Sequence, residues 1–194
     1  MRVALPIRML RRCLCASAFC LLGSCAYIAA SAWYFQRTAD AAFTAQVETA
    51  PLPLINAKAV RTSAPPGVVG RLAIPRLGLS VMVLEGTSAA TLRRAAGHIA
   101  GTALPGDRGN TAISAHRDTF FRPLRGIRPR DSISLKTSAG DFRYRVVSIS
   151  IVEPGDTGVL ASADTQVLTL VTCYPFTFIG PAPERFVVRA ERIL

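Results

Sequence analysis

The sequence has few acidic residues, few histidines and almost no cysteine outside its N-terminal part. It holds 12 Asp and Glu against 23 Lys and Arg, and its only histidines are His98 and His116. Four of the five cysteines lie within the first 25 residues, which leaves Cys173 alone in the rest of the chain. A disulfide framework is therefore excluded for that part. An unpaired thiol there either pairs between molecules or is kept free because its chemistry is used.

Signals for nucleic-acid or metal binding are also missing. Four of the positive charges lie in residues 1–12, and the remaining sequence has no basic stretch interleaved with aromatics and no zinc-finger or RNP-like pattern. No acidic cluster indicates a calcium site. We therefore expect no nucleic-acid partner, no cofactor and no metal ion. The excess of arginine instead indicates a surface attracted to anionic lipid or to a cell-envelope polymer.

Charged residues are absent from residues 13–35, a stretch of 23 residues. A helix of this length spans roughly 30 Å, the thickness of the hydrocarbon core of a bilayer. Trp33 and Tyr34 lie at one edge, and the arginines of residues 1–12 lie at the other, which is the side that stays in the cytoplasm. This pattern predicts a cytoplasmic basic segment at 1–12, a single-pass transmembrane signal anchor at 13–35, and the rest of the chain on the extracytoplasmic side of the cytoplasmic membrane.

Two other interpretations of the N-terminal stretch stay open beside the retained anchor. Residues 30–32, Ala-Ser-Ala, have the form of a signal-peptide cleavage site, although the apolar run before them is longer than usual. Residues 22–25, Leu-Gly-Ser-Cys, resemble a lipoprotein processing box. All three interpretations place the rest of the chain outside the cytoplasmic membrane, and we favour the retained anchor.

The remaining chain divides into a linker and a domain. Residues 36–67 are rich in Ala, Thr and Pro without a sustained period, which is typical of a stalk, and the anchor helix is expected to extend into them as far as about Glu48. From residue 68 to residue 194, short apolar runs are bounded by Gly, Pro and Asp. Strands are expected at residues 69–74, 79–84, 110–116, 131–137, 141–152, 166–173 and 185–193. A helix is expected at 88–95, with Ser88 as its N-cap and Gly97 ending it, and at most a short helix at 118–124. Eight or so short strands with one or two short helices predict an all-β domain, a closed β-barrel.

Cys173 is the candidate nucleophile because it ends a strand, where scaffolds often present reactive groups. The thiolate is the reactive form, so a base or a cation has to lie near it. His116 ends an earlier apolar strand, and parallel pairing of the two strands would bring thiol and imidazole to the same barrel rim. His98 lies beside Gly97 in a turn-like stretch and is interpreted as a surface or structural histidine.

Acyl chemistry at a thiolate also requires stabilisation of the developing oxyanion. Arg185 opens the last strand 12 residues after Cys173, so a hairpin would return it to the same rim. On composition alone, an ordinary surface charge is the simpler interpretation of this arginine.

Together these residues resemble the sortases, the cysteine transpeptidases of the bacterial envelope. The resemblance lies in the Thr-Leu-Val-Thr-Cys run at residues 169–173, in Arg185 and in His116, and the residues around these three positions are most similar to class D sortases. It implies an eight-stranded sortase-like β-barrel at residues 68–194. It also implies that Cys173 attacks the Thr carbonyl of a Leu-Pro-x-Thr-Gly-like sorting signal on a surface protein and passes the acyl fragment, through a thioacyl enzyme, to an amine of the cell envelope.

Residue roles follow from the same resemblance. His116 is implied to be the proton donor and acceptor, and Arg185 to hold the substrate or the oxyanion. Thr172 and Ala115, each of which precedes one of these catalytic residues, are expected to form walls of the substrate groove. The pilin-polymerising class C members differ by a lid segment before the barrel and often by a C-terminal anchor, neither of which is visible here. The arginine-rich stretch at residues 117–130 could contact an anionic acceptor, but a solvated face is the simpler interpretation.

Two rival functions remain open. A cysteine hydrolase would use water to resolve the same thioacyl intermediate, and nothing in the motif forbids it. A non-enzymatic envelope-binding module would have kept the barrel without the chemistry.

Overall fold

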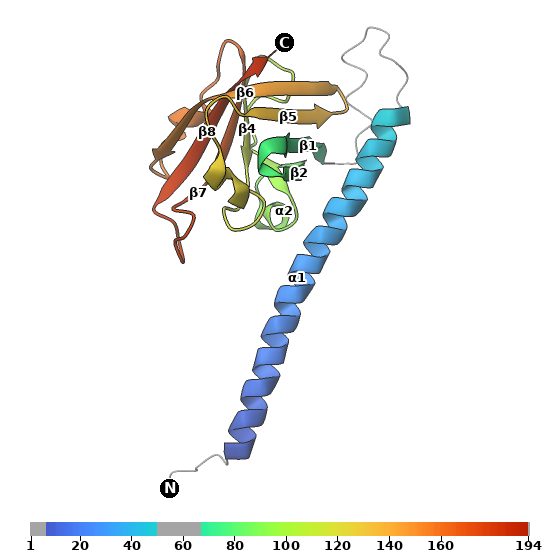
Figure 1. The fold of residues 1–194 in the computed structure, drawn as a ribbon, viewed down its shortest axis with the longest axis vertical. Coiled ribbons are helices and arrows are strands. Elements are labelled where there is room, and N and C mark those ends of the chain that lie inside the picture. The colour runs from blue at the N-terminus through green and yellow to red at the C-terminus, as the bar shows by residue number, and fades with distance from the viewer. Residues whose placement is uncertain (1–6, 50–66, 194) are drawn as a thin grey trace.

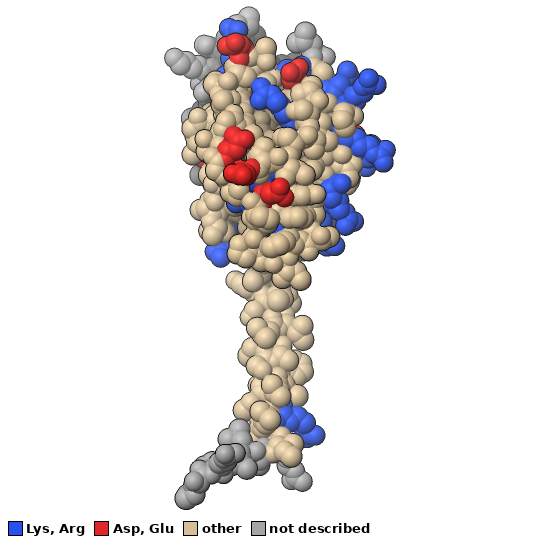
Figure 2. Space-filling view, turned by 90° about the vertical axis from the view of Figure 1, so that its left-hand side faces the viewer, with Lys and Arg blue, Asp and Glu red and all other residues tan. Residues whose placement is uncertain are grey.

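The computed structural model describes residues 7–49 and 67–193, which form one long helix and one barrel (Figure 1). Helix α1, Ile7–Thr49, contains the stretch without charged residues, and this stretch forms the uncharged stem below the barrel in Figure 2. The helix is long and apolar enough to cross a membrane, with the qualifying segment at Met9–Ala45. This agrees with the helix expected over residues 13–35 and with its expected extension to about Glu48.

Eight strands close into a barrel in the order β1-β2-β3-β4-β7-β8-β6-β5. Their bounds are β1 Val68–Ile74, β2 Leu79–Glu85, β3 Ala96–His98, β4 Gly109–Ser114, β5 Ser132–Thr137, β6 Gly140–Val152, β7 Gln166–Tyr174 and β8 Glu184–Ile193. Only the β2–β3 and β4–β7 neighbours are parallel. The helical pieces are short: α2 Ala89–Leu92 and the 3₁₀ turns η2 Pro75–Leu77, η3 Arg122–Gly126 and η4 Thr157–Leu160. The prediction of a closed eight-stranded barrel with short helices is confirmed.

One strand was not expected from the sequence. The stretch predicted as helix 88–95 is helical only at Ala89–Leu92, capped by Ser88 as predicted, and Gly97 lies inside β3 instead of ending the helix. A Cβ atom on Gly97 would collide with the carbonyl oxygen of Gly86. This glycine therefore permits the close approach of backbones that lets β3 enter the barrel.

The barrel interior is filled by aliphatic side chains from every long strand, including the fully buried Leu72, Ile113, Leu135 and Leu168. The alternation of buried and partly exposed positions along β1 gives the period of two that a half-buried strand requires. Each such side chain stabilises the fold by about 1.5–3 kcal/mol through removal of apolar surface from water. Burial also raises the pKa of Tyr144, because its phenolate would lose hydration.

The C-terminal part of α1 lies against the barrel. The side chain of Gln36 accepts a hydrogen bond from the Met82 amide of β2 at 2.9 Å and donates one to the Arg94 carbonyl at 2.7 Å. Arg71 of β1 pairs with Asp40, and Phe43 is only 2% exposed. The first part of the expected stalk, residues 36–67, is thus helix docked on β1 and β2, while residues 50–66 of that segment lie outside the described residues.

Candidate active site

The expected strand ends meet because β4 and β7 are parallel neighbours. Their register pairs Ser114 with Val171, and the two chains stay together beyond it. The Ala115 amide donates to the Val171 carbonyl at 3.4 Å, and the Thr172 hydroxyl donates to the Ala115 carbonyl at 2.7 Å. His116 and Cys173, the next residues on each side, therefore emerge at the same rim of the barrel.

Arg185 reaches the same rim through the antiparallel pairing of β7 with β8. Its Cα lies directly opposite that of Cys173 in the register. One guanidinium nitrogen, Nη1, donates to the carbonyls of Ala182 and Glu184 at 3.2 and 2.9 Å. The guanidinium thus lies over the turn that leads into β8, with its Nη2 and Nε free of hydrogen bonds to the described residues.

The candidate catalytic side chains of His116 and Cys173 are accessible from solvent, whereas the residues that precede them are buried. His116 is exposed and Cys173 is partly exposed, whereas Thr172 and Ala115 are 2% and 3% exposed. The hydrogen bond from Thr172 to Ala115 ties the two strand ends together. The role of Thr172 and Ala115 as substrate-groove walls stays a prediction, as do the catalytic roles of Cys173, His116 and Arg185.

His98 is a buried structural residue rather than a surface one. It is 2% exposed, its Nδ1 lies 2.9 Å from a carboxylate oxygen of Glu85, and its Nε2 contacts the Ala103 carbonyl at 3.1 Å and the Thr102 hydroxyl at 3.0 Å. Both ring nitrogens thus have partners. Of the two alternatives left open by the sequence, the structural one is correct, and no ring nitrogen is left for a substrate.

Sequence reasoning missed an aromatic cluster beside the site. The rings of Tyr174, Phe176 and Phe186 lie with centroids 5.1–6.1 Å apart, stacked or edge to face. Tyr174 and Phe186 are the strand neighbours of Cys173 and Arg185, and successive strand side chains point to opposite faces. Phe176 and Phe186 pack against the core, so the cluster closes this end of the barrel beneath the candidate site. The signal in the sequence was the presence of four aromatic residues within residues 174–186, of which Phe178 is not part of the cluster.

It also missed the role of Arg117, which follows His116. Its guanidinium donates to three carbonyls of the β7–β8 loop, those of Pro175, Phe178 and Gly180, at 3.1, 2.6 and 3.0 Å. It also lies over the Phe178 ring, 5.9 Å from the centroid. One side chain thus links the segment after His116 to the loop that joins Cys173 to Arg185.

Residues 7–49 and 67–193 contain no group of three or more His, Cys, Asp or Glu side chains placed to hold a metal ion. The candidate site consists of a thiol, an imidazole and a guanidinium at one end of the barrel, beside the aromatic cluster. Such a set can carry out nucleophilic acyl transfer with proton transfer by histidine.

Comparison with known proteins first defines the fold. The structure is similar to that of Sortase C1 of GBS Pilus Island 1, with a TM-score of 0.69 over 82% of this chain and 92% of that one. The sequences are 21% identical, so this likeness concerns the fold alone. The architecture is that of a sortase barrel.

The sequence then defines the family. The family model described as Sortase domain matches residues 72–193, and the chain belongs to the sortase family. It is 34% identical to Sortase D of Bacillus subtilis (strain 168) over 125 residues, 64% of this chain and 63% of that protein. It is 30% identical to a Sortase D5 transpeptidase from Clostridium perfringens, whose structure it matches with a TM-score of 0.59 over 66% of this chain and 79% of that one. The chain spans about three fifths of the length of the Bacillus relative.

Proposed function

We propose that this protein is a membrane-anchored cysteine transpeptidase that cleaves a Leu-Pro-x-Thr-Gly-like sorting signal at the bond after Thr. The acyl fragment passes to an amine of the cell envelope. The observation that carries the proposal is the parallel pairing of β4 with β7, because it brings His116 and Cys173 to one rim. The pairing of Cys173 with Arg185 across β7 and β8, and the membership of the sortase family, support it further.

The reaction has two halves. In the first, the Cys173 thiolate attacks the carbonyl carbon of the Thr residue, and the C–N bond to the next residue breaks as His116 donates a proton to the leaving amine. In the second, the acceptor amine attacks the thioester carbon and gives its proton to His116, and the Cys173 thiolate leaves. Arg185 holds the substrate or the oxyanion that forms in each half, where positive charge lowers the barrier.

Helix α1 is proposed to fix the enzyme in the cytoplasmic membrane with its N-terminus inside. The basic residues precede the apolar segment, and Trp33 and Tyr34 lie near its other end with exposed side chains, as expected for aromatic residues at a membrane interface. The barrel then lies on the extracytoplasmic side, where surface proteins with sorting signals would be the acyl donors.

The proposal is tested by trapping the acyl fragment. The full-length protein in detergent is incubated with a library of Leu-Pro-x-Thr-x peptides, and the mass added at Cys173 identifies the acyl group. We expect a thioester that ends in Thr and that hydroxylamine removes. The matched Cys173→Ala variant should carry no adduct, and an adduct of equal yield in that variant would refute the catalytic assignment.

The hydrolase alternative is separated by the choice of acceptor. Adding amine peptides should divert the product from free acid to amide in proportion to acceptor concentration. If no tested amine changes the product, water is the acceptor and transpeptidation is wrong. A binding module without chemistry is excluded once Cys173→Ala abolishes turnover while the barrel stays folded.

A further inference from the structure

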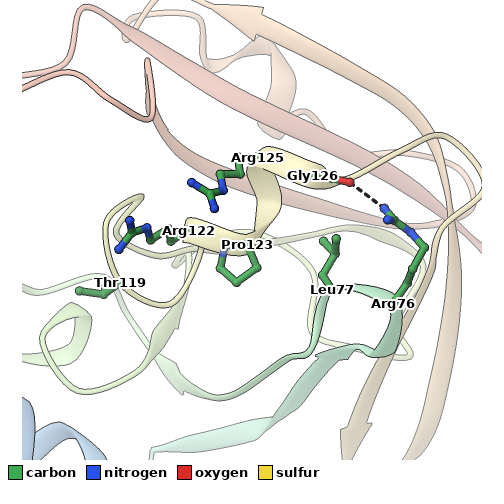
Figure 3. Close-up of a pocket in the computed structure, with 7 residues that line it drawn as sticks. All are labelled: Arg76, Leu77, Thr119, Arg122, Pro123, Arg125 and Gly126. Carbon is green, nitrogen blue, oxygen red and sulfur yellow. Dashed lines mark hydrogen bonds between the residues drawn. The ribbon is translucent and has the colours of Figure 1, made fainter.

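A pocket of about 530 Å³ lies between η2 and η3 (Figure 3). The residues on its η3 side follow His116 closely in the sequence. Its walls include the apolar side chains of Leu77 and Pro123, and its cationic residues are Arg76, Arg122 and Arg125. None of its lining residues is acidic. A pocket with apolar walls and only positive charge favours an anionic ligand that also has apolar or peptide groups.

One of the three cations is already neutralised within the protein. Arg76 pairs with the buried carboxylate of Asp131 and donates to the Gly126 carbonyl at 2.7 Å. The hydrogen bonds from Arg76 are the largest cause of the lowered pKa of Asp131, which keeps that carboxylate ionised. Arg76 therefore fixes η3 against η2 and has little charge to offer a ligand.

The other two cations have no such partner. The side chains of Arg122 and Arg125 make no hydrogen bond or ion pair with any residue in the described parts of the chain. In Figure 3 both guanidinium groups point to the same side of the pocket, away from Arg76. Two neighbouring uncompensated guanidinium groups repel each other, and a carboxylate or phosphate between them would relieve that repulsion and accept charge-assisted hydrogen bonds.

The pocket is tied to the candidate base by the backbone. The Phe121 amide donates to the His116 carbonyl at 3.1 Å, and the Arg122 amide donates to the Thr119 carbonyl at 3.2 Å. The stretch from His116 to η3 is thus one compact turn, with Thr119 at the pocket wall. An acceptor amine has to reach His116 to give up its proton, so the rest of the acceptor molecule passes close to this turn.

We infer that the pocket binds the acceptor, and that the natural acceptor amine belongs to a molecule with an anionic group, a carboxylate or a phosphate, held by Arg122 and Arg125. This inference rests on the proposed transpeptidase function and assigns a second binding region to the same reaction. It goes beyond the catalytic residues, because neither arginine takes part in bond making.

The test compares three acceptor peptides that differ at one side chain. Gly-Gly-Gln-amide is neutral, Gly-Gly-Glu-amide has the nearly isosteric carboxylate, and Gly-Gly-phosphoserine-amide has a phosphate. We expect the acceptor KM of at least one anionic peptide to be about two- to fivefold lower than that of the neutral one, which is the upper part of the range for exposed ion pairs. Of the two anionic peptides, the one with the lower KM shows whether a carboxylate or a phosphate is the better ligand. Equal KM values for all three peptides would overturn the inference.

Two variants decide whether these arginines cause the preference. The double variant Arg122→Gln/Arg125→Gln should lose it, and Arg122→Lys/Arg125→Lys should restore part of it, because lysine keeps the charge but not the planar fork. The matched control Arg93→Gln/Arg143→Gln removes the same charge from exposed positions on other elements and should keep the preference. If the control loses as much preference as the test variant, general electrostatic attraction explains the result and the pocket is refuted. The proposed function fails separately, by the absence of amide product from every peptide.

Discussion

The two histidines of this chain lie at strand ends of the same barrel, yet their surroundings are opposite. His98 ends β3, is almost fully buried, and has both ring nitrogens in contact with a carboxylate, a carbonyl or a hydroxyl. His116 lies two residues beyond β4, is exposed, and has no side-chain hydrogen bond to any of the described residues. Buried polar groups are satisfied because leaving them unpaired costs stability, whereas a group that has to exchange protons with a substrate needs a free nitrogen.

The same contrast divides the rest of the rim from the body of the barrel. Asp131 and Thr172 are buried and bonded, and each joins two parts of the backbone. The Cys173 thiol, like the His116 imidazole, has no hydrogen bond within the described residues. The residues that stabilise the barrel thus differ from those proposed to carry out the chemistry, and substitutions should separate the two effects.

The largest expected effect is that of His116→Ala on turnover. Loss of the proposed proton donor and acceptor should lower kcat/KM for the sorting peptide by about 10²–10⁴-fold, with little change in the thermal midpoint, because the side chain is exposed. His98→Ala should do the reverse, with near-normal turnover per folded molecule and a stability loss of about 1–3 kcal/mol from unpaired buried groups. Peptide cleavage and thermal unfolding measured on both variants check the pair. An active His116→Ala together with an inactive but folded His98→Ala would exchange the two roles.

Arg185 should show the next largest effect. Arg185→Gln is expected to lower kcat by about 10²–10³-fold, since it removes the charge that we propose holds the substrate or the oxyanion. Arg185→Lys should recover only part of the rate, because a lysine keeps the charge but cannot present two parallel donors. Steady-state kinetics on both variants provide the measurement. A glutamine variant within twofold of the unmodified enzyme would make Arg185 an ordinary surface charge.

Arg117 extends the comparison to a side chain that holds a loop in place and is not itself proposed to be catalytic. Its three hydrogen bonds to the β7–β8 loop should be lost in Arg117→Gln, and we expect kcat/KM for the donor peptide to fall about tenfold. Amide hydrogen exchange in residues 175–184 should accelerate in the same variant, which a purely electrostatic role would not cause. The exposed Arg93→Gln is the matched control. Unchanged exchange in the loop would show that Arg117 does not brace it.

The sequence predicted the candidate site best where an apolar strand ends at a residue with a reactive or charged side chain. The apolar runs that end at His116 and Cys173, and the distance from Cys173 to Arg185, were enough to predict a shared rim, and the β4–β7 and β7–β8 pairings agree with this. Strand β3 was missed because three residues have no measurable period, and its place depends on contact between Gly97 and the distant Gly86.

The contacts of the Arg117 and His98 side chains could not be predicted from the sequence, because only the fold brings their partners to them. Arg117 is one of several arginines in its stretch, and its partners are backbone carbonyls about 60 positions away. The burial of His98 depends on Glu85 and Thr102, which only the folded barrel brings to its ring. Pairings between distant residues follow from topology, and local sequence patterns do not contain them.

The smallest expected effect concerns Asp131, which is buried and satisfied like His98 but titrates at low pH. Its pKa lies below the usual value of 3.8 because Arg76 and the Arg128 amide stabilise the carboxylate. A folded-state pKa below the unfolded one means that ionisation stabilises the fold above the unfolded value, and that this contribution is lost as the pH falls through the folded value. Asp131→Asn should therefore lower the thermal midpoint by about 4 °C at pH 7, and by progressively less as the pH falls below 4. Thermal unfolding of the two proteins between pH 7 and pH 2.5 checks this. A difference in thermal midpoint that stays constant over that range would mean that Asp131 contributes through its shape and through hydrogen bonds that asparagine can also make. The charge of Asp131 would then not explain why this buried group stabilises the fold.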